Sequence, residues 1–110
     1  MFDDVTFPKP ARGSCWVPAA DVYRTPSGWL VKFDLAGVNP SDLELQRHGH
    51  RLCIRGTRRD VLVQTGVQSY SLEISYNRFE RTVHFPTEIE SAHVSTEYRD
   101  GMLLVRLEQV

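Results

Sequence analysis

Three runs near the end of the chain alternate between apolar and polar residues, and this alternation constrains the fold more than any other feature. The runs cover residues 79–85, 93–98 and 102–107. A period of two over such lengths is typical of β-strands that bury one face. Asp100 and Gly101 stand between the second and third runs, and this pair favours a two-residue hairpin turn. The last third of the chain is therefore predicted to be antiparallel sheet.

The residues before this stretch repeat the pattern in shorter pieces. Four segments have the composition of short strands, at residues 21–24, 29–35, 42–46 and 51–56. The stretch 57–77 is less regular, although its second half alternates weakly, and no part of the chain has a helical period. Short strands that recur about every 8 to 12 residues are typical of a sandwich. The predicted fold class is all-β: an immunoglobulin-like, two-sheet antiparallel sandwich of about eight short strands.

Length, charge and apolar content narrow the class of protein. At 110 residues the chain has the size of one domain. A net charge of −1 gives no general attraction to nucleic acid or to an acidic membrane surface. The apolar runs are too short to span a bilayer, and the acidic start does not resemble a signal peptide. Because Cys15 and Cys53 are too few for a disulfide framework, we expect a reduced, cytoplasmic protein.

The first residues, 1–18, are predicted to form a flexible arm, and residues 19–110 to form the domain itself. Prolines and a glycine interrupt the arm, which excludes a helix or a central strand there. Phe2, Phe7 and Trp16 nevertheless make it more apolar than a typical disordered tail. Two interpretations stay open: the arm folds back over the sheet, or it contacts partner proteins.

No group of residues has the spacing of a catalytic or metal site. The four histidines, His48, His50, His84 and His93, have no cysteine or carboxylate cluster beside them at a spacing suited to metal ligands. The sequence also lacks a G-x-S-x-G nucleophile motif and a glycine-rich phosphate loop. We therefore expect a protein that is not an enzyme and that uses no metal or other cofactor.

Basic residues are concentrated in one segment, between residues 47 and 59. No aromatic residue in this window could stack on nucleic-acid bases. Arg51, Cys53 and Arg55 alternate onto the outward face of their strand. This pattern favours a solvated sheet face over a nucleic-acid site.

One charged residue breaks the alternation of the predicted sheet. Arg81 is in phase with Phe79 and Val83, which places its guanidinium on the apolar side of its strand. A charge there is costly unless it meets an acceptor or reaches water. Either the side chain extends to solvent, or it forms a structural ion pair, which could cross a subunit interface.

The last predicted strand is apolar on both faces, with Leu103 on one side and Leu104 on the other. Leu43, Leu45 and Val94 add apolar side chains on neighbouring strands. These residues either complete the core of a single chain or form a surface that binds an extended segment.

Four stretches, in order along the chain, resemble the alpha-crystallin domain of the small heat-shock protein family. The first is Asp34-Leu35-Ala36-Gly37-Val38 with Ser41-Asp42-Leu43, which resembles the family's L-P-G-v…e-d-L, and the second is Leu52-Cys53-Ile54-Arg55-Gly56, which resembles L-t-I-r-G. The third is Phe79-Glu80-Arg81 with Phe85-Pro86, which resembles F-x-R-x-x-x-L-P. The fourth is Thr96 to Asp100-Gly101-Met102-Leu103, which resembles A-x-x-x-n-G-v-L. The likeness runs from residue 19 to residue 107.

The resemblance implies an ATP-independent chaperone, a holdase that binds partly unfolded proteins and prevents their aggregation. Residues 57–77 would be the dimerisation loop of the bacterial and plant type. Its strand, near residues 71–75, would pair with the first strand of a partner chain, giving a homodimer by strand exchange that can assemble further. The residues implied at this interface are Asp21, Val22, Tyr23, Leu72, Ile74 and Arg81.

The resemblance also implies a groove for an extended apolar peptide. Leu43 and Leu45 would bound it on one strand, and Val94 and Thr96 on another. In the family, this groove receives an Ile/Val-x-Ile/Val tail from another subunit, and client segments compete for similar surfaces. The apolar side chains of the arm would add client contacts.

The sequence departs from the family pattern at several positions. Ala36, Thr96 and Asn77 replace the usual proline, alanine and glycine, and the anchoring tail does not follow Leu107. Val61-Leu62-Val63 has the V-x-V form of that tail. One hypothesis is that this segment docks in a neighbour's groove, and the alternative is that it packs at the dimer interface.

A different functional class also stays open. A specific protein-binding module on the same sandwich, similar to co-chaperone domains, would have one defined partner and no general effect on aggregation. The long loop with its exchangeable strand favours the holdase.

Overall fold

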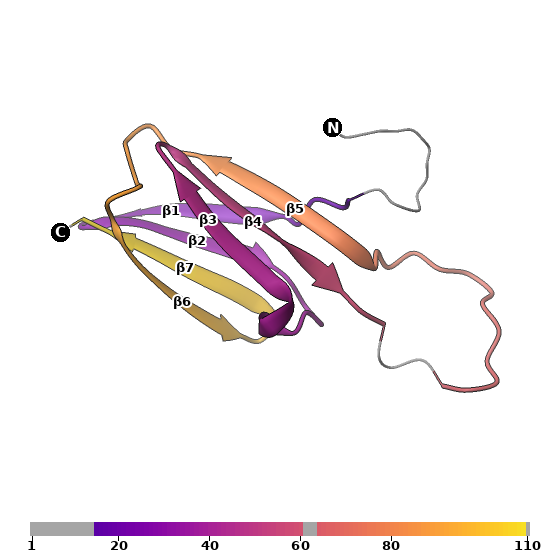
Figure 1. The fold of residues 1–110 in the computed structure, drawn as a ribbon. Helices are drawn as coiled ribbons and strands as arrows, with labels where there is room; N and C mark the ends of the chain where they lie inside the picture. The colour runs from indigo at the N-terminus through magenta and orange to yellow at the C-terminus, as the bar shows by residue number, and fades with distance from the viewer. Residues whose placement is uncertain (1–14, 61–63, 110) are drawn as a thin grey trace.

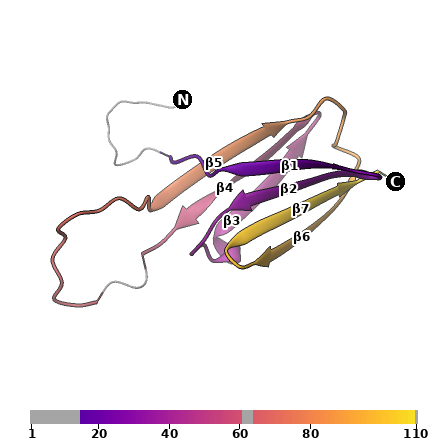
Figure 2. The same cartoon turned by 180° about the vertical axis from the view of Figure 1, so that it is seen from behind.

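Seven antiparallel strands in two sheets make up the described part of the chain, residues 15–60 and 64–109, in this computed structural model (Figure 1). The strands are β1 (Ala20–Thr25), β2 (Gly28–Asp34), β3 (Leu43–His48), β4 (Arg51–Arg58), β5 (Asn77–His84), β6 (His93–Arg99) and β7 (Met102–Glu108). One sheet has the strand order β1-β2-β7-β6 and the other β3-β4-β5, and the two sheets pack face to face (Figures 1 and 2). A 3₁₀ turn, η2 (Pro40–Asp42), leads into β3. The predicted two-sheet sandwich is confirmed.

The core lies between the sheets and is built from the side chains that alternate inward. On the four-stranded sheet, Val31 of β2 is in register with Val105 of β7, and both are fully buried. On the three-stranded sheet, Leu52 of β4 is in register with Val83 of β5, and both are buried. Each fully buried side chain of this kind stabilises the fold by roughly 1.5–3 kcal/mol. Burial of one face therefore sets the register of every strand.

Asp100 and Gly101 form the predicted turn between β6 and β7. Arg99 and Met102 are the last paired residues on either side of it. The φ angles of Asp100 and Gly101 are 54° and 79°. A two-residue turn with positive φ at both positions matches the twist of the strands, and aspartate and glycine are among the residues that tolerate it.

A second glycine sets how closely the chain packs near the end of β4. Gly56 is in register with Leu43 of β3 and Phe79 of β5. A Cβ atom at this position would lie 2.8 Å from the Phe79 ring and nearer still to the carbonyl of Asp42. The absence of a side chain therefore gives the phenyl ring its fully buried place in the core.

The segment 70–76 forms no strand, although it alternates weakly in sequence, so the described residues contain seven strands rather than about eight. Tyr70 and Leu72 are 100% and 80% exposed. A strand is stable only where its backbone groups are paired. No strand of the described chain lies beside this segment, because residues 64–76 of the long loop between β4 and β5 extend away from the sandwich (Figures 1 and 2).

Candidate functional site

The open edges of the two sheets are the surfaces at which this sandwich can bind another chain. The edge strands are β1 and β6 in one sheet and β3 and β5 in the other. Both views place β3 and β6 at one margin of the sandwich and β1 and β5 at the opposite margin (Figures 1 and 2). Edge strands present unpaired N–H and C=O groups that can pair with an extended segment.

The four residues predicted to bound a groove lie at the β3–β6 margin. Leu43 and Leu45 are half-buried on the inner face of β3, and Val94 is half-buried on the inner face of β6. All three pack against the core. Thr96 lies two residues further along β6 and is exposed. The three apolar side chains pack against the core and keep part of their surface exposed. Binding of a peptide there stays a prediction.

Two polar side chains at this margin form hydrogen bonds to backbone carbonyls of other segments. The Arg47 guanidinium donates hydrogen bonds to the carbonyls of Ala92 and Ile89, just before β6 begins. The Tyr98 hydroxyl donates to the Leu35 carbonyl at 2.8 Å. The sequence did not predict a structural role for Arg47, although Arg47 alternates in phase with the inward-facing leucines of β3. Arg47 positions β3 against the chain that leads into β6.

Five of the six residues predicted for a dimer interface are exposed, and the sixth, Arg81, is half-buried. Asp21, Val22 and Tyr23 lie on the edge strand β1, where Val22 and Tyr23 are 42% and 45% exposed. Leu72 and Ile74 lie on the long loop and are 80% and 65% exposed. Exposed apolar side chains gathered in this way mark interaction surfaces. The structure does not bring the two groups together within one chain.

The segment before β1 covers the free edge of β5. The backbone N–H of Trp16 donates to the Arg78 carbonyl at 3.1 Å, and the N–H of Glu80 donates to the Trp16 carbonyl at 3.1 Å. The indole and the Phe79 ring pack with centroids 5.3 Å apart. The indole Nε1 is buried and has no acceptor among the described residues. This placement agrees with an arm that folds back over the sheet, at least from Cys15 onward.

Several predicted features fall outside the described residues. They are Phe2 and Phe7 of the arm and the segment Val61-Leu62-Val63. A client-binding role for the arm, including Trp16, stays a prediction, as does docking of the V-x-V segment.

Arg81 meets a backbone acceptor. Its side chain is half-buried on the core side of β5, and its Nη1 donates to the Pro18 carbonyl at 3.0 Å. Among residues 15–60 and 64–109, no carboxylate forms an ion pair with it. The guanidinium is thus satisfied by the segment that also carries Trp16, and its place in a subunit interface stays a prediction.

Arg58, at the end of β4, joins three separate segments. Its Nε and Nη2 donate to the Ser75 carbonyl at 2.9 and 2.5 Å, and its Nη1 donates to the Ala36 carbonyl at 3.0 Å. The guanidinium lies 4.2 Å from the ring centroid of Trp16 and 5.5 Å from that of Tyr76. Cation–π contacts of this kind are worth about 0.5–2 kcal/mol. One side chain therefore links the arm to the end of the long loop.

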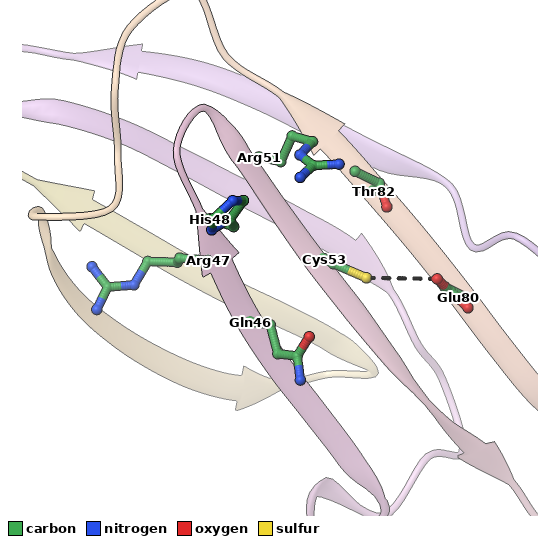
Figure 3. A pocket seen from close by; sticks show the side chains of 7 residues that line it. All are labelled: Gln46, Arg47, His48, Arg51, Cys53, Glu80 and Thr82. Atoms are coloured by element: carbon green, nitrogen blue, oxygen red, sulfur yellow. Dashed lines mark hydrogen bonds between the residues drawn. The ribbon is translucent and has the colours of Figure 1, made fainter.

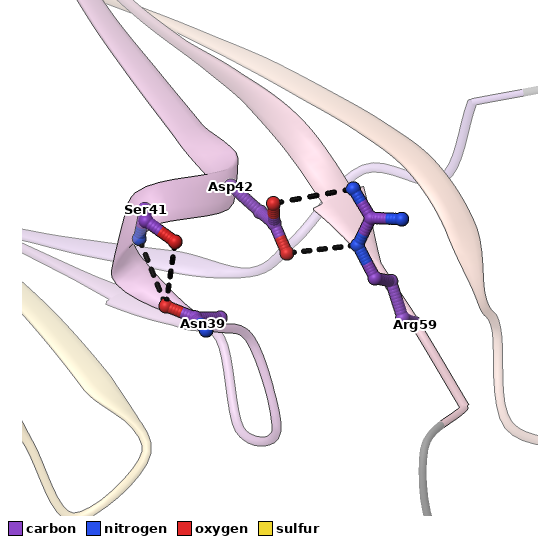
Figure 4. Close-up of polar contacts among 4 residues, drawn as sticks. All are labelled: Asn39, Ser41, Asp42 and Arg59. Atoms are coloured by element: carbon purple, nitrogen blue, oxygen red, sulfur yellow. Dashed lines mark hydrogen bonds and ion pairs between the residues drawn. The ribbon is translucent and has the colours of Figure 1, made fainter.

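The start of the long loop is held by an ion pair. Arg59 donates from Nε and Nη2 to the two carboxylate oxygens of Asp42, at 3.0 and 3.2 Å (Figure 4). This hydrogen bond lowers the pKa of the Asp42 carboxyl. The side chain of Asn39 accepts hydrogen bonds from the N–H and hydroxyl of Ser41, which caps the η2 turn that carries Asp42.

Neither a metal centre nor a membrane helix is found in the described ranges. No three histidine, cysteine or acidic side chains there are placed to hold a metal ion. No helix in that part of the chain is long and apolar enough to cross a membrane.

Comparison with known proteins agrees with this geometry. Residues 21–110 match the Hsp20/alpha crystallin family. The chain is similar to spore protein SP21 of Stigmatella aurantiaca, with 28% identity over 84% of this chain and 54% of that protein. It is also similar to the structure of heat shock protein 16.0 from Schizosaccharomyces pombe, with 26% identity, a TM-score of 0.74, and coverage of 86% and 87% of the two chains. The structure of hspA from Xanthomonas axonopodis gives 27% identity, a TM-score of 0.72, and coverage of 87% and 96%. The match spans little more than half the length of three curated relatives and about a quarter of a fourth.

Proposed function

Because the chain belongs to the Hsp20/alpha-crystallin family, we propose that it is an ATP-independent holdase that binds partly unfolded proteins and prevents their aggregation. Membership of this family implies a chaperone role. The mode of action proposed here rests on one observation: two unpaired strand edges, β3 and β6, lie at one margin beside half-buried apolar side chains. Capture of an extended apolar segment needs only such an edge and such side chains, without chemical energy.

In this proposal, client segments bind at the β3–β6 margin. The segment adds its backbone to an edge strand, and its alternate side chains pack on Leu43, Leu45 and Val94. Thr96, which is exposed, contacts the segment further along β6. Unfolded chains expose apolar runs and unpaired backbone that folded proteins bury, so the margin discriminates between the two states. The apolar arm, through Phe2, Phe7 and Trp16, adds contacts to clients.

The functional unit in this proposal is a homodimer formed by strand exchange. Residues 71–75 of one copy pair with β1 of the other, next to Asp21, Val22 and Tyr23. Support comes from Leu72 and Ile74, which are exposed on a loop that extends away from its own sandwich. Pairing would give this segment the backbone partner that it lacks within its own chain, and it would cover the edge of β1. Arg81, near the arm, lies at the rim of this interface.

An aggregation assay tests the holdase. A heat-labile client is warmed with the full chain at substoichiometric to equal ratios, with and without ATP, and light scattering is recorded. We expect suppression of scattering that does not depend on ATP. A folded chain that leaves scattering unchanged would contradict the proposal, and suppression confined to one client would favour a specific binding module.

A pair of variants tests the β3–β6 margin as the client site. Val94→Lys places a charge on the inner face of β6, and Ser95→Lys places the same charge on the exposed outer face one residue away. We expect Val94→Lys to lose suppression and Ser95→Lys to retain it, with thermal melts confirming that both fold. Equal activity of the two variants would remove client binding from this margin and leave the arm as its site.

A further inference from the structure

A row of three side chains that can carry positive charge crosses the outer face of the three-stranded sheet. His48 on β3 is in register with Arg51 on β4, and Arg51 is in register with His84 on β5. All three residues are exposed. Neighbouring strands lie about 4.8 Å apart, so side chains in one row can reach the same small ligand.

The guanidinium at the centre of this row, that of Arg51, has no partner among the described residues. Within residues 15–60 and 64–109, every arginine or lysine side chain other than Arg51 and Arg106 contacts a polar group or an aromatic ring or has another electrostatic partner. On the same sheet face, Arg55 is held by an amide oxygen at 2.8 Å and a carboxylate at 3.4 Å. The side chains of His48 and His84 likewise have no hydrogen-bond partner in these ranges. The row is therefore free to bind a ligand.

The row borders a hollow on the sheet surface (Figure 3). Arg51 and His48 contribute to its lining, together with Gln46 and Thr82, which offer an amide and a hydroxyl donor. Figure 3 shows Arg51 extending toward Thr82, with His48 on the adjoining strand. Among the described residues that line the hollow, Glu80 is the one carboxylate, and it accepts a hydrogen bond from a neighbouring thiol at 3.8 Å. Donors thus outnumber acceptors around the hollow.

We propose that this face binds an oxyanion of the phosphate class at His48, Arg51 and His84, and that acidification strengthens the binding. A guanidinium presents two parallel N–H groups to two oxygens of such an anion. A protonated imidazole donates from both ring nitrogens and carries a positive charge, so protonation of the two histidines would add two positive charges to the row. The site lies on the outer face of the three-stranded sheet, whereas clients are assigned to the edge of β3 and the side chains of its inner face.

Two other titratable side chains near the row already have backbone hydrogen-bond partners. Glu90 lies in the connection between β5 and β6. Its carboxylate accepts a hydrogen bond at 2.9 Å from the N–H of Gly49, which lies in the turn between β3 and β4. His50, in the same turn, contacts the Phe85 carbonyl through Nδ1 at 3.2 Å.

Sulfate is the probe that tests the site, because it stays a dianion throughout the pH range of interest. Binding of radiolabelled sulfate to the full chain is measured by equilibrium dialysis at about pH 5.5 and about pH 8, with sodium chloride holding the ionic strength constant. We expect tighter binding at the lower pH and a loss of about tenfold in Arg51→Gln. The double variant His48→Gln, His84→Gln should lose the pH dependence.

Arg106→Gln is the matched control, since Arg106 is the other exposed arginine without a partner in the described ranges and has no histidine in register with it. It should bind sulfate as the unchanged protein does. Equal weakening in Arg106→Gln and Arg51→Gln, or equal binding by the unchanged protein and Arg51→Gln, would overturn the proposal. Arg51→Lys keeps the positive charge but not the two parallel N–H groups, and it should bind sulfate with intermediate affinity. This graded loss separates a binding effect from a folding defect.

Competition then identifies the source of the anion. Inorganic phosphate is compared with a phosphoserine peptide and its unphosphorylated form. Displacement of sulfate by inorganic phosphate alone assigns a free ion, and displacement by the phosphopeptide but not by its unphosphorylated form assigns a phosphate carried on a protein. Failure of both to displace sulfate contradicts the site.

Discussion

The strands β5 and β1 lie at the same margin of the sandwich, but the described chain covers the edge of one and leaves the edge of the other bare (Figure 2). Trp16 makes two backbone hydrogen bonds to β5 and packs its ring on Phe79. Along β1, Val22 and Tyr23 stay partly exposed. An uncovered apolar edge promotes uncontrolled association. A single copy covers β5 by itself, whereas the edge of β1 stays open to the second copy that we propose.

A single residue links the covered edge to the exposed loop. Arg58 contacts the Trp16 ring on one side and the Ser75 carbonyl on the other. The base of the loop is therefore tied to the arm that closes β5, while the apolar side chains nearer its tip remain exposed. A stiff base lowers the conformational entropy that the proposed exchange of strands would cost.

The largest expected effect is on dimer formation at the uncovered edge of β1. Leu72→Asp with Ile74→Asp should raise the dissociation constant of the dimer by about a hundredfold or more, because each aliphatic side chain contributes roughly 1.5–3 kcal/mol when buried and 1.4 kcal/mol is tenfold. Sedimentation velocity across a concentration series measures the change. Val67→Asp is the control, since Val67 is 60% exposed on the same loop but lies outside residues 71–75. Dimers that persist unchanged in the double variant would remove strand exchange as the mode of assembly.

The next effect is on the stability of the fold at the edge of β5 that Trp16 covers. Trp16→Ala removes the ring contact with Phe79 and should destabilise the fold by about 2–3 kcal/mol, below the range for a fully buried tryptophan. Trp16→Phe should cost less, because it keeps an aromatic ring there and removes an indole N–H that has no acceptor in the described ranges. Urea unfolding measures both variants. Val17→Ala, at a residue that is 66% exposed, should stay within about 0.5 kcal/mol of the unchanged protein.

Hydrogen exchange separates loss of the cover from general destabilisation. The amide of Glu80 donates to the Trp16 carbonyl, so its protection should fall in Trp16→Ala more than that of Val83 in the same strand. A uniform loss of protection along β5 would mean that Trp16 stabilises the whole fold rather than this edge.

The strands and their buried faces could be predicted because alternation is a local property of the sequence. Phe33 and Leu52 face inward where their phase placed them, and Asp100-Gly101 turns the chain by its own backbone preferences. The outward face of β4, with Arg51, was readable in the same way.

The contacts at the closed edge could not be predicted, because they join segments far apart in sequence and leave no periodic signal. Trp16 meets Phe79, and Arg58 meets Ser75, through ring packing and carbonyl acceptors that many residues could supply. The segment 71–75 shows a related limit. Alternation indicates that it can form a strand, but its partner strand is not found among the described residues of the same chain.

A smaller effect should follow from loosening the link between the two edges. Arg58→Gln removes two cation–π contacts and the pair of hydrogen bonds to Ser75, and should cost about 1–2 kcal/mol. A double-mutant cycle with Trp16→Ala should give a coupling of about 0.5–1 kcal/mol. Limited proteolysis should cut the loop faster in Arg58→Gln than in Arg55→Gln, whose side chain lies on the outer sheet face. No coupling in the cycle would mean that the arm and the loop base are held independently.

The smallest effect is a pH dependence at the start of the loop. The hydrogen bond from Arg59 lowers the pKa of Asp42 in the folded protein, so the ion pair stabilises the fold at any pH above the ordinary value for aspartate, near 3.9. This stability is lost as the pH falls through the lower, folded-state pKa. In urea unfolding, Asp42→Asn and Arg59→Gln should therefore each be less stable than the unchanged protein near neutral pH, and the difference should shrink below about pH 4. Because the pair is exposed, added salt should also reduce it. A difference that persisted in strong acid would show that these residues stabilise the loop base through packing and not through charge.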